Sequence, residues 1–322
     1  MDIVLCTDNN YAMPCGVTIT SILENNKKSS LVFHIVSMDL AESVKDKLRS
    51  ISSIYDNATF KFYELKKDFI ESYNFSVFDS QYMSVATYMR LFLGDILPED
   101  VTKVIYLDCD VIVRKDLSDL WQIDIENYSI AGIEDLYASS QKFSIFKFLG
   151  YDESYKYFNA GIVFINIEYW RKHDLVTVFL DYFKKIEGKL FFYDQDILNG
   201  TLYDTKLLLP VKYNVHEYYY RRRTKRLGNR EEIAEAIEDP AIIHYSGADK
   251  PWMKTCMHPM KEEYLKYKSL SLWKDAPLIW KKNTFQEKYK YYEKKILMSL
   301  GLRRPRYYKI KKDVATGKYT FR

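Results

Sequence analysis

Short apolar segments alternate with segments of helical periodicity along the first two-thirds of the chain. The apolar segments, which predict strands, are Asp2–Cys6, Leu31–Ser37, Thr59–Tyr63 and Lys103–Leu107. The segments between them, which predict helices, are Tyr11–Glu24, Ala41–Ser53 and Met83–Gly94. Strands and helices that alternate at this spacing form βαβ units, so we expect an α/β fold with a mostly parallel sheet flanked by helices. Such sheets bind ligands beyond the carboxyl ends of their strands.

The predicted elements continue less regularly after these units. Further strands are predicted at Ile130–Ile133, Gly161–Asn166, Leu207–Leu209 and Ile242–Tyr245, and further helices at Tyr169–Ile186, Asp194–Leu202 and Glu231–Glu238. The composition of the 322-residue chain shifts near Lys281, and no Gly- or Ser-rich linker precedes this point. We therefore expect a main domain over residues 1–280 and a C-terminal tail over residues 281–322.

The C-terminal tail is predicted to be a helical segment that is both basic and aromatic. It holds fourteen Lys and Arg against three Asp and Glu, a charge of +11, so the main domain carries −7 of the whole-chain charge of +4. Eight aromatic residues are interleaved with these charges. This combination suits an anionic bilayer surface. A nucleic-acid partner, which the acidic main domain disfavours, and a basic helix pair without a partner are the alternatives.

The sequence predicts neither a membrane-spanning helix nor a signal peptide. No apolar run approaches the ~18–20 residues of a spanning helix, and the first residues, Met-Asp-Ile-Val-Leu, begin a strand. The four cysteines are scattered and form no CxxC pair, which disfavours structural zinc and a disulfide framework. We expect a cytoplasmic protein whose tail attaches it to the inner face of the cell membrane.

The pair Asp108 and Asp110 follows the apolar strand Val104–Leu107 directly. Residues i and i+2 of an extended segment face the same way, so both carboxylates can reach one hard divalent cation. Such a cation can bridge the phosphates of a nucleotide and stabilise the charge on a leaving diphosphate. The alternative is a solvated turn, because Asp is common at strand ends.

A second polar segment, His244–Trp252, follows the apolar strand Ala241–Ile243. His244 could complete a site of carboxylates and imidazole, which suits Mn²⁺ better than Mg²⁺. Gly247 lets backbone N–H groups approach an oxyanion, and Lys250 offers a charge for phosphate. The alternative for His244 is a surface histidine in a turn.

Seven segments occur in a fixed order along residues 1–255. They are Ile3–Tyr11, Thr87–Leu91, Val104–Val111, Leu117–Trp121, Tyr157–Asn166 with nearby Trp170, Asp194–Asn199 and His244–Trp252. As an ordered set they resemble glycosyltransferase family 8, retaining transferases that include glycogenin and bacterial lipopolysaccharide glucosyl- and galactosyltransferases. The spacing is most similar to the branch of lipooligosaccharide galactosyltransferases, which also ends in a basic, aromatic tail at the membrane surface.

The resemblance implies a GT-A fold and a UDP-hexose donor bound with Mn²⁺, with Mg²⁺ as the alternative ion. The implied metal ligands are Asp108, Asp110 and His244. The implied donor contacts are Asp8, Asn10 and Tyr11 for the uridine, Gly247 and Lys250 for the diphosphate, and Arg90, Cys109, Asn159, Ala160 and Gly161 for the rest of the donor. Local alternatives remain: a helix cap for Asp8 or Asn10, core packing for Tyr11, a helix-surface ion pair for Arg90, and a turn before a buried strand for Asn159–Gly161.

Asp194, Gln195 and Asp196 form the third element that the resemblance marks as catalytic. It places Gln195 on the face of the sugar opposite the leaving diphosphate and lets Asp194 bond sugar hydroxyls. Retention needs either a nucleophile on that face or a route in which the acceptor enters from the face that UDP leaves. Because an amide oxygen is a poor nucleophile, we favour the same-face route. The alternative for this trio is helix capping, with Asp194 at the N-cap.

The acceptor side departs from the most similar branch. The resemblance implies that Asp135 and Phe192 lie near the acceptor, where a loop aspartate and a core aromatic are the alternatives. Tyr82 stands where that branch has a His, and Ser246 where it has a Cys. The acceptor therefore need not be lactose-like, and a glycan on lipid, lipopolysaccharide or glycoprotein is expected.

Together these features predict a Mn²⁺-dependent, retaining transferase of galactose or glucose from a UDP-sugar to a glycan, with an α-glycosidic product. A phosphatase of the haloacid-dehalogenase type, which also follows an apolar strand with D-x-D, is one alternative. It would give His244–Lys250 and Asp194–Asp196 no role. A self-glycosylating, glycogenin-like transferase is the other, because 29 tyrosines offer acceptor hydroxyls.

Overall fold

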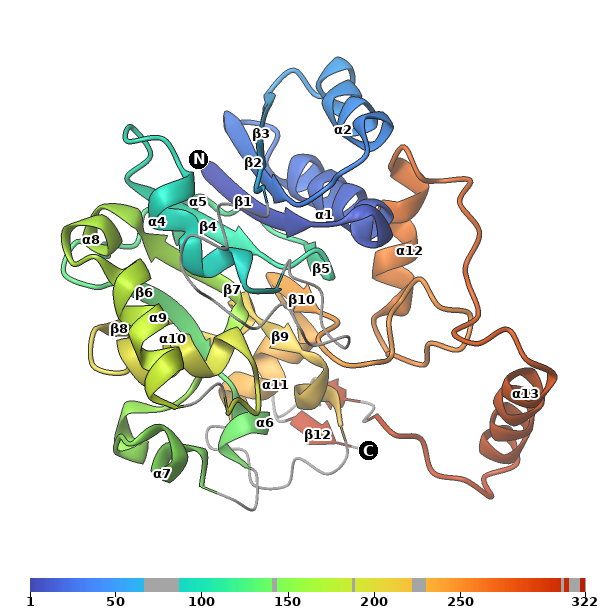
Figure 1. The fold of residues 1–322 in the computed structure, drawn as a ribbon. Helices are drawn as coiled ribbons and strands as arrows, with labels where there is room; N and C mark the ends of the chain where they lie inside the picture. Colours follow the sequence, from blue (N-terminus) through green and yellow to red (C-terminus); the bar gives the residue numbers. More distant parts are fainter. Residues whose placement is uncertain are drawn as a thin grey trace.

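The computed structural model of the chain describes residues 1–66, 87–140, 144–186, 189–221, 230–307, 310–312 and 319–321. Within them, a seven-stranded sheet with the order β3-β2-β1-β4-β7-β6-β8 lies between two layers of helices (Figure 1). Its strands are β1 (Asp2–Thr7), β2 (Leu31–Ser37), β3 (Ala58–Glu64), β4 (Lys103–Leu107), β6 (Ile130–Glu134), β7 (Phe158–Asn166) and β8 (Lys206–Leu208).

The predicted α/β fold with a mostly parallel sheet is confirmed. β1 pairs in parallel with both β2 and β4, β2 pairs in parallel with β3, and β6 pairs in parallel with β8. β7 is the exception, because it runs antiparallel to its neighbours β4 and β6. Since β1 and β4 are parallel neighbours, their carboxyl ends meet at one edge of the sheet, where Asp8 and Asp108 follow them.

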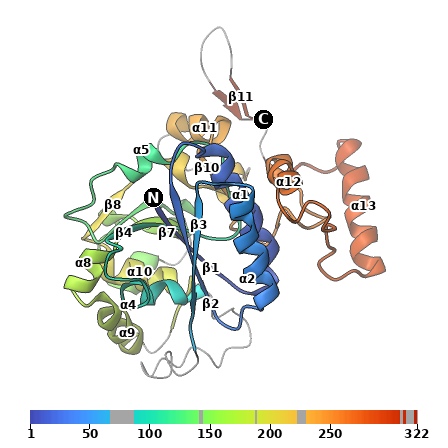
Figure 2. The same ribbon diagram turned by 90° about the horizontal axis from the view of Figure 1, so that it is seen from above.

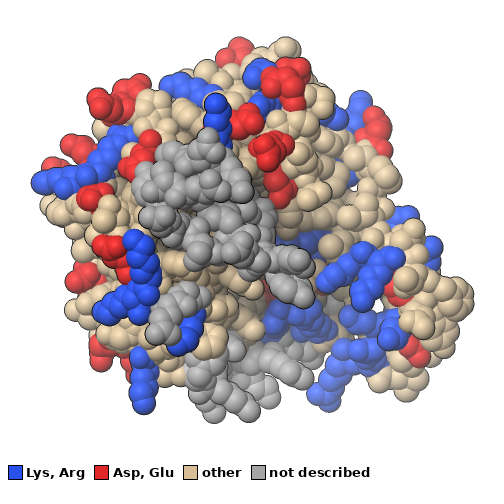
Figure 3. All heavy atoms as spheres, viewed as in Figure 1, with Lys and Arg blue, Asp and Glu red and all other residues tan. Residues whose placement is uncertain are grey.

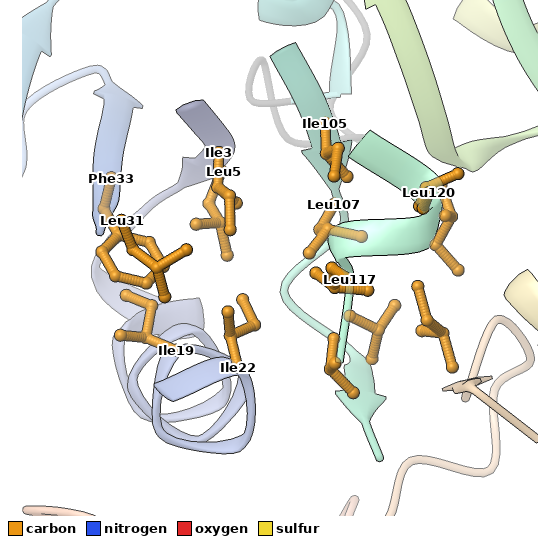
Figure 4. Close-up of a cluster of buried hydrophobic side chains, with 14 of the residues drawn as sticks. Ile3, Leu5, Ile19, Ile22, Leu31, Phe33, Ile105, Leu107, Leu117 and Leu120 are labelled. Carbon is orange, nitrogen blue, oxygen red and sulfur yellow. The ribbon is translucent and has the colours of Figure 1, made fainter. Parts of the chain in front are cut away.

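Alternating side chains bury both faces of the sheet. In β1, Ile3 and Leu5 belong to one core cluster and Val4 to another, as expected when successive residues point to opposite faces. Ile19 and Ile22 of α1 point toward the first face (Figure 4). The views show α1 and α2 on one side and α4, α8 and α9 on the other (Figure 2).

The described helices agree with most of the predicted ones. They are α1 (Ala12–Asn25), α2 (Glu42–Arg49), α4 (Leu93–Ile96), α5 (Ser118–Trp121), α6 (Leu136–Ser139), α7 (Ile145–Leu149), α8 (Ile167–Lys172), α9 (Leu175–Lys185), α10 (Asp194–Leu202), α11 (Arg230–Glu238), α12 (Lys261–Leu270) and α13 (Phe285–Ser299). The single helix predicted over Tyr169–Ile186 is wrong. The chain turns at Asp174, which takes a left-handed conformation with φ of 46°, and this separates α8 from α9.

The helix predicted over Met83–Gly94 lies only partly within the described residues. There, Met89–Phe92 forms a 3-10 helix that leads into α4. Its side chains, including Met89 and Phe92, are buried in the core cluster on the α8 side of the sheet.

A small second sheet completes the edge where β4 ends. It has the order β5-β10-β9, with β5 (Val111–Val113), β10 (Ile242–His244) and β9 (Val215–His216). β5 and β9 were not predicted from the sequence. β10 pairs antiparallel with β5, in a register that sets His244 opposite Val111. This pairing carries a histidine from far along the chain to the loop that follows β4.

The tail consists of α13 and a short hairpin of β11 (Ile310–Lys312) and β12 (Tyr319–Phe321), so it is not entirely helical. α13 stands apart from the main body in both views (Figures 1 and 2). After α13 the chain returns to the main body, where the hydroxyl of Tyr307 donates to Glu217 at 2.6 Å. No helix among the described residues is long and apolar enough to cross a membrane.

Candidate active site

A cavity of about 670 Å³ lies at the carboxyl ends of β1 and β4. Most of the residues predicted for the site line it. These are Asp8, Tyr11, Arg90, Asp108, Cys109, Asp110, Asp135, Asn159, Ala160, Gly161, Phe192, Asp194, Gln195, His244, Ser246, Gly247 and Lys250. Asn10 is exposed and does not line the cavity, so its contact to a ribose stays a prediction. Tyr82 lies outside the described residues.

Asp108, Asp110 and His244 bring one ligand atom each within 4.8 Å of one another. Nε2 of His244 lies 3.3 Å from Oδ1 of Asp110 and 3.7 Å from Oδ2 of Asp108. The arrangement follows from the fold, because β4 ends directly before Asp108 and the β5–β10 pairing delivers His244. Two carboxylates and one imidazole form a donor set that fits a divalent ion such as Mn²⁺.

Asp110 is buried and pairs with the ammonium group of Lys250, which also donates to the carbonyl oxygen of Tyr245 at 2.8 Å. Burial favours a higher pKa for the Asp110 carboxyl, but the charges of Lys250 and His244 outweigh it and hold the pKa below its usual range. The carboxyl is therefore ionised at neutral pH. Lys250 also lines the cavity, where its charge can contact an anionic ligand.

Arg90 joins three parts of the site. Its Nη2 lies 3.0 Å from Oδ1 of Asp108, its Nε lies 2.8 Å from Oδ2 of Asp194, and its Nη1 donates to the carbonyl oxygen of Ala160. Its guanidinium group also lies over the ring of Tyr106, 4.3 Å from the ring centroid. Arg90 is 5% exposed, so this ion pair is buried inside the site instead of lying on a helix surface.

Asp194 faces Arg90 instead of capping a helix. α10 begins at Asp194 itself, and its N-cap residue, Tyr193, makes no capping hydrogen bond through its side chain. Burial raises the pKa of the Asp194 carboxyl to about 7, although Arg90 opposes this rise, and the charge of Asp108 adds to it. A carboxyl group that titrates near neutral pH in a cavity is typical of functional sites.

Gly161 in β7 passes so close to the predicted metal ligands that a side chain would not fit. A Cβ atom there would lie 2.3 Å from Cε1 of His244 and 2.6 Å from Oδ2 of Asp108. The carbonyl oxygen of Gly161 accepts from the backbone N–H of Asp108 at 2.8 Å. Asn159–Gly161 lie within β7, so the alternative of a turn before the strand is wrong, and the backbone at Gly161 closely approaches the predicted metal ligands.

Both ends of the Gln195 amide are held. Its Oε1 accepts from the backbone N–H of Ala160 at 2.9 Å, and its Nε2 donates to Oδ2 of Asp135 at 3.2 Å. The other carboxylate oxygen of Asp135 accepts from two backbone N–H groups at the start of α6. Asp135 is thus a buried cap that also orients Gln195, and the alternative of an exposed loop aspartate is wrong.

Asp196 shapes the turn before α10. Its Oδ2 accepts from the backbone N–H groups of Phe191 and Phe192 at 2.6 and 2.8 Å, and its Oδ1 accepts from the hydroxyl of Tyr157 at 2.7 Å. Tyr193 has a φ of 55°, which is strained for a residue with a side chain. These hydrogen bonds fix the strained turn that presents Phe192 to the cavity.

At the β1 end of the cavity, Asp8 caps the 3-10 helix Asn9–Tyr11. Its Oδ1 accepts from the backbone N–H groups of Asn10 and Tyr11, each at 2.9 Å. The ring of Tyr11 meets Trp252 edge to face, with 5.6 Å between centroids. The capping and packing alternatives therefore describe real contacts, and both Asp8 and Tyr11 also line the cavity.

The other end of the cavity is aromatic. The ring of Tyr137 lies 6.0 Å from Phe192 and 5.1 Å from Tyr218, measured between centroids. Arg221 pairs with Glu217 at 2.5 Å beside them, and all five residues line the cavity. Flat rings of this kind bind the apolar faces of sugars. The predicted acceptor residue Phe192 is therefore part of a larger aromatic wall.

Ser246 and Gly247 also line the cavity. A Cβ atom at Gly247 would lie 1.9 Å from Oε2 of Glu217, so the backbone here is as crowded as at Gly161. Cys109, between the two aspartates that are predicted metal ligands, is buried and its thiol donates to the carbonyl oxygen of Cys6 at 3.2 Å.

Three buried polar residues of the site were not predicted from the sequence as functional. The carboxylate of Glu217 pairs with Arg221 and Arg306 and accepts a hydrogen bond from the hydroxyl of Tyr307. The hydroxyl of Tyr106 donates to Asp108. The side chain of Asn214 is hydrogen-bonded to His244. Glu217 and Asn214 have partners far away in the chain, whereas Tyr106 acts on a residue only two positions away.

Comparison with known proteins places this site in a family. The model of the family described as Glycosyl transferase family 8 matches residues 2–256, which is well over half of the chain. The chain belongs to glycosyltransferase family 8. The matched residues include all three predicted metal ligands and exclude the tail. Family membership sets aside the phosphatase alternative for Asp108 and Asp110.

Similar proteins cover most of this chain. General stress protein A of Bacillus subtilis is 30% identical over 279 residues, which is 85% of this chain and 94% of that protein. A lipopolysaccharide 1,2-glucosyltransferase of Escherichia coli is 29% identical, over 90% of this chain and 85% of that protein. The crystal structure of the galactosyltransferase LgtC with donor and acceptor sugar analogues has a TM-score of 0.73 and 25% identity, and covers 84% of this chain and 96% of that one. This likeness confirms the predicted GT-A fold.

Proposed function

We propose that this family 8 transferase moves galactose or glucose from a UDP-sugar to a glycan acceptor with retention of configuration. The observation that carries the proposal is the cluster of Asp108, Asp110 and His244 within 4.8 Å, set in the wall of the cavity. The similarity to a lipopolysaccharide 1,2-glucosyltransferase and to the galactosyltransferase LgtC supports a hexose donor.

The donor would lie along the cavity from the β1 end to Gln195. Tyr11 offers an aromatic face for the base, and Asp8 offers carboxylate oxygens near it. Asp108, Asp110 and His244 would hold Mn²⁺, which supplies a positive charge for the diphosphate of the donor and for the departing UDP. Lys250 adds a second positive charge on the same wall.

The chemistry at the sugar follows from groups that this chain provides. In the same-face route, the bond from the anomeric carbon to the β-phosphate oxygen breaks and the bond to the acceptor oxygen forms on the same face. The acceptor proton passes to the departing phosphate oxygen, so no protein base is needed. Gln195 supports this route, because its oxygen already accepts from Ala160 and its amide is a poor nucleophile. Asp194, next to Arg90, can orient sugar hydroxyls.

The test is release of UDP from a panel of UDP-sugars, with Mn²⁺ and with a chelator, before any acceptor is added. We expect slow, metal-dependent release from one sugar. Asp110→Asn should lower that rate by about 100-fold or more, because it removes a charged ligand. Asp46→Asn, at an exposed aspartate in α2, is the matched control and should keep the rate. No release and no UDP binding with any sugar would refute the proposal.

The acceptor is proposed to be a glycan on lipid, lipopolysaccharide or glycoprotein. The lipopolysaccharide 1,2-glucosyltransferase relative supports the lipid-linked class. Intact-mass measurement of the protein after the same incubation distinguishes the glycogenin-like alternative, in which hexose would accumulate on the chain itself.

We also propose that α13 lies on an anionic membrane surface. Phe285, Tyr289, Tyr292, Ile296 and Leu300 recur at helical spacing and are each more than half exposed. Lysines are interleaved with them, and Lys and Arg side chains gather around α13 (Figure 3). An exposed apolar stripe with flanking positive charges is the pattern of a helix that binds in the plane of a bilayer.

Vesicle binding tests this contact in the full chain. Replacing Phe285, Tyr289 and Ile296 together by Ser should lower co-sedimentation with vesicles of phosphatidylglycerol and phosphatidylcholine by about tenfold or more. Ile54→Ser, at an apolar side chain that is 60% exposed elsewhere, is the control. Substitution is preferable to deletion of the tail, because deletion would also remove Tyr307 from Glu217. Unchanged binding by the triple variant would refute the contact.

A further inference from the structure

Asn214 lies between two predicted parts of the active site. It stands just before β9 and is completely buried. Its side chain touches His244 on one side and Asn159 on the other, through hydrogen bonds of 3.0 and 2.9 Å. An amide can serve both neighbours only in one orientation, because its oxygen accepts and its nitrogen donates.

The orientation of these amides is fixed by a backbone donor. The backbone N–H of Gly161 donates to Asn159 at 3.1 Å, so the atom of Asn159 that it meets is the oxygen. The nitrogen of Asn159 is then the atom that donates to Asp135 at 2.9 Å. Because Asn214 faces the same oxygen of Asn159, it must face it with its own nitrogen. The reverse orientation would place two amide oxygens against each other in a buried site.

The oxygen of Asn214 therefore faces Nδ1 of His244, which must carry the proton. The other ring nitrogen, Nε2, is left with its lone pair directed toward Asp108 and Asp110. We propose that Asn214 is a positioning residue that holds His244 in the Nδ1–H tautomer, the form whose Nε2 can ligate a divalent cation. A hydrogen bond to the second ring nitrogen of a ligating histidine fixes its tautomer and its ring orientation.

The same network continues to the predicted catalytic amide. Oδ2 of Asp135 accepts from both Asn159 and Gln195, at 2.9 and 3.2 Å. A single chain of hydrogen bonds thus joins His244 to Gln195 through Asn214, Asn159 and Asp135. This inference rests on the proposed function only where it concerns the bound cation.

The tautomer can be measured in the protein without metal. In the full chain labelled with ¹⁵N-histidine, the ring signals of His244 are identified by their loss in His244→Gln, among five histidines. We expect the unmodified protein to show a protonated Nδ1 that is hydrogen-bonded to Asn214. An Nε2–H tautomer in the unmodified protein would overturn the proposal, whether or not any variant folds.

Variants at Asn214 test the consequence for the cation. Asn214→Leu has similar volume but no acceptor for Nδ1–H, so it should weaken Mn²⁺ binding by about 10- to 100-fold. Mn²⁺ binding is measured by electron paramagnetic resonance. Asn214→Asp keeps an oxygen for Nδ1–H but loses the N–H that Asn214 donates to Asn159, so it should retain the tautomer of His244 while breaking the link to Asn159. Asn166→Leu, which removes another buried asparagine at the far end of β7, should lower the thermal midpoint and leave Mn²⁺ affinity unchanged.

The outcomes separate the two proposals. A folded Asn214→Leu variant that binds Mn²⁺ within about twofold of the unmodified affinity would refute the role of Asn214 at the cation. If the unmodified protein binds no Mn²⁺ while His244 shows the Nδ1–H tautomer, the cation site of the proposed function is refuted and the assignment of the tautomer is supported.

Discussion

Gly161→Ala adds one methyl group at the point where β7 meets the predicted metal ligands. The new Cβ would lie 2.3 Å from Cε1 of His244 and 2.6 Å from Oδ2 of Asp108. Ordinary van der Waals contact begins near 3.4 Å, so the histidine ring is more than 1 Å too close. The ring cannot simply rotate away, because Asn214 holds its Nδ1 at 3.0 Å.

The size of the effect follows from the tolerance of metal sites. Ligand distances in such sites hold to about ±0.2 Å, so a ligand shift of about 1 Å removes His244 from the coordination sphere. We expect Mn²⁺ affinity and kcat/KM for the UDP-sugar to fall by about 100-fold or more. Overpacking should lower the free energy of unfolding by only about 1–3 kcal/mol, which leaves the protein folded.

The assay combines Mn²⁺ binding, UDP release and urea unfolding on the same preparations. Gly94→Ala is the matched control, because its Cβ would make only ordinary contacts of 3.7 Å or more in buried α4. That variant should keep full metal affinity. If Gly161→Ala binds Mn²⁺ and releases UDP like the unmodified protein, the geometry assigned to Asp108 and His244 is wrong.

Three further predictions concern the buried charges around this centre. The pKa of Asp194 in the folded protein, about 7, exceeds the ordinary value of about 3.9. This group therefore lowers the free energy of unfolding as the pH rises from about 4 to 7, by on the order of 4 kcal/mol at most. Asp194→Asn should remove that pH dependence, measured by urea unfolding at pH 5 and 8. Arg90→Lys cannot pair with Asp108 and Asp194 together, and should lower kcat/KM by about 100-fold in the UDP-release assay. Asp196→Ala should cost about 2–4 kcal/mol in unfolding free energy and leave Mn²⁺ affinity unchanged, because it frees the turn at Phe192 but touches no metal ligand.

Each of these predictions has a contradicting result. Equal pH dependence of unfolding in Asp194→Asn would mean that another group carries the titration. Full activity in Arg90→Lys would show that the double ion pair does not matter for transfer. Loss of Mn²⁺ binding in Asp196→Ala would show that the turn and the metal ligands are coupled directly.

The sequence predicted the parts of the fold that depend on local patterns. β1, β2 and β4 were found because buried parallel strands are continuous apolar runs between helices, whereas β3 is an edge strand whose side chains are only partly buried. The direction of β7 could not be predicted, because Phe158–Asn166 is buried on both faces and such a run has the same appearance in either direction. The break at Asp174 was missed because the helical pattern of α8 continues into α9.

The site was predictable where one segment supplied the chemistry. Asp108 and Asp110 follow a strand directly, so their proximity could be inferred from the sequence. The contact between Asn214 and His244 depends on how β9 pairs with β10, and no local pattern encodes that pairing. The return of Tyr307 to Glu217 is equally non-local, spanning 90 residues.

The most direct test of the proposed function is the position of Mn²⁺ in crystals of the protein grown with MnCl₂ and UDP, located by anomalous scattering at the manganese edge. We predict a peak within about 2.0–2.3 Å of Nε2 of His244 and of carboxylate oxygens of Asp108 and Asp110, with phosphate oxygens of UDP completing the coordination. A peak elsewhere, or UDP bound in the cavity without any peak at these three residues, would contradict the proposed site.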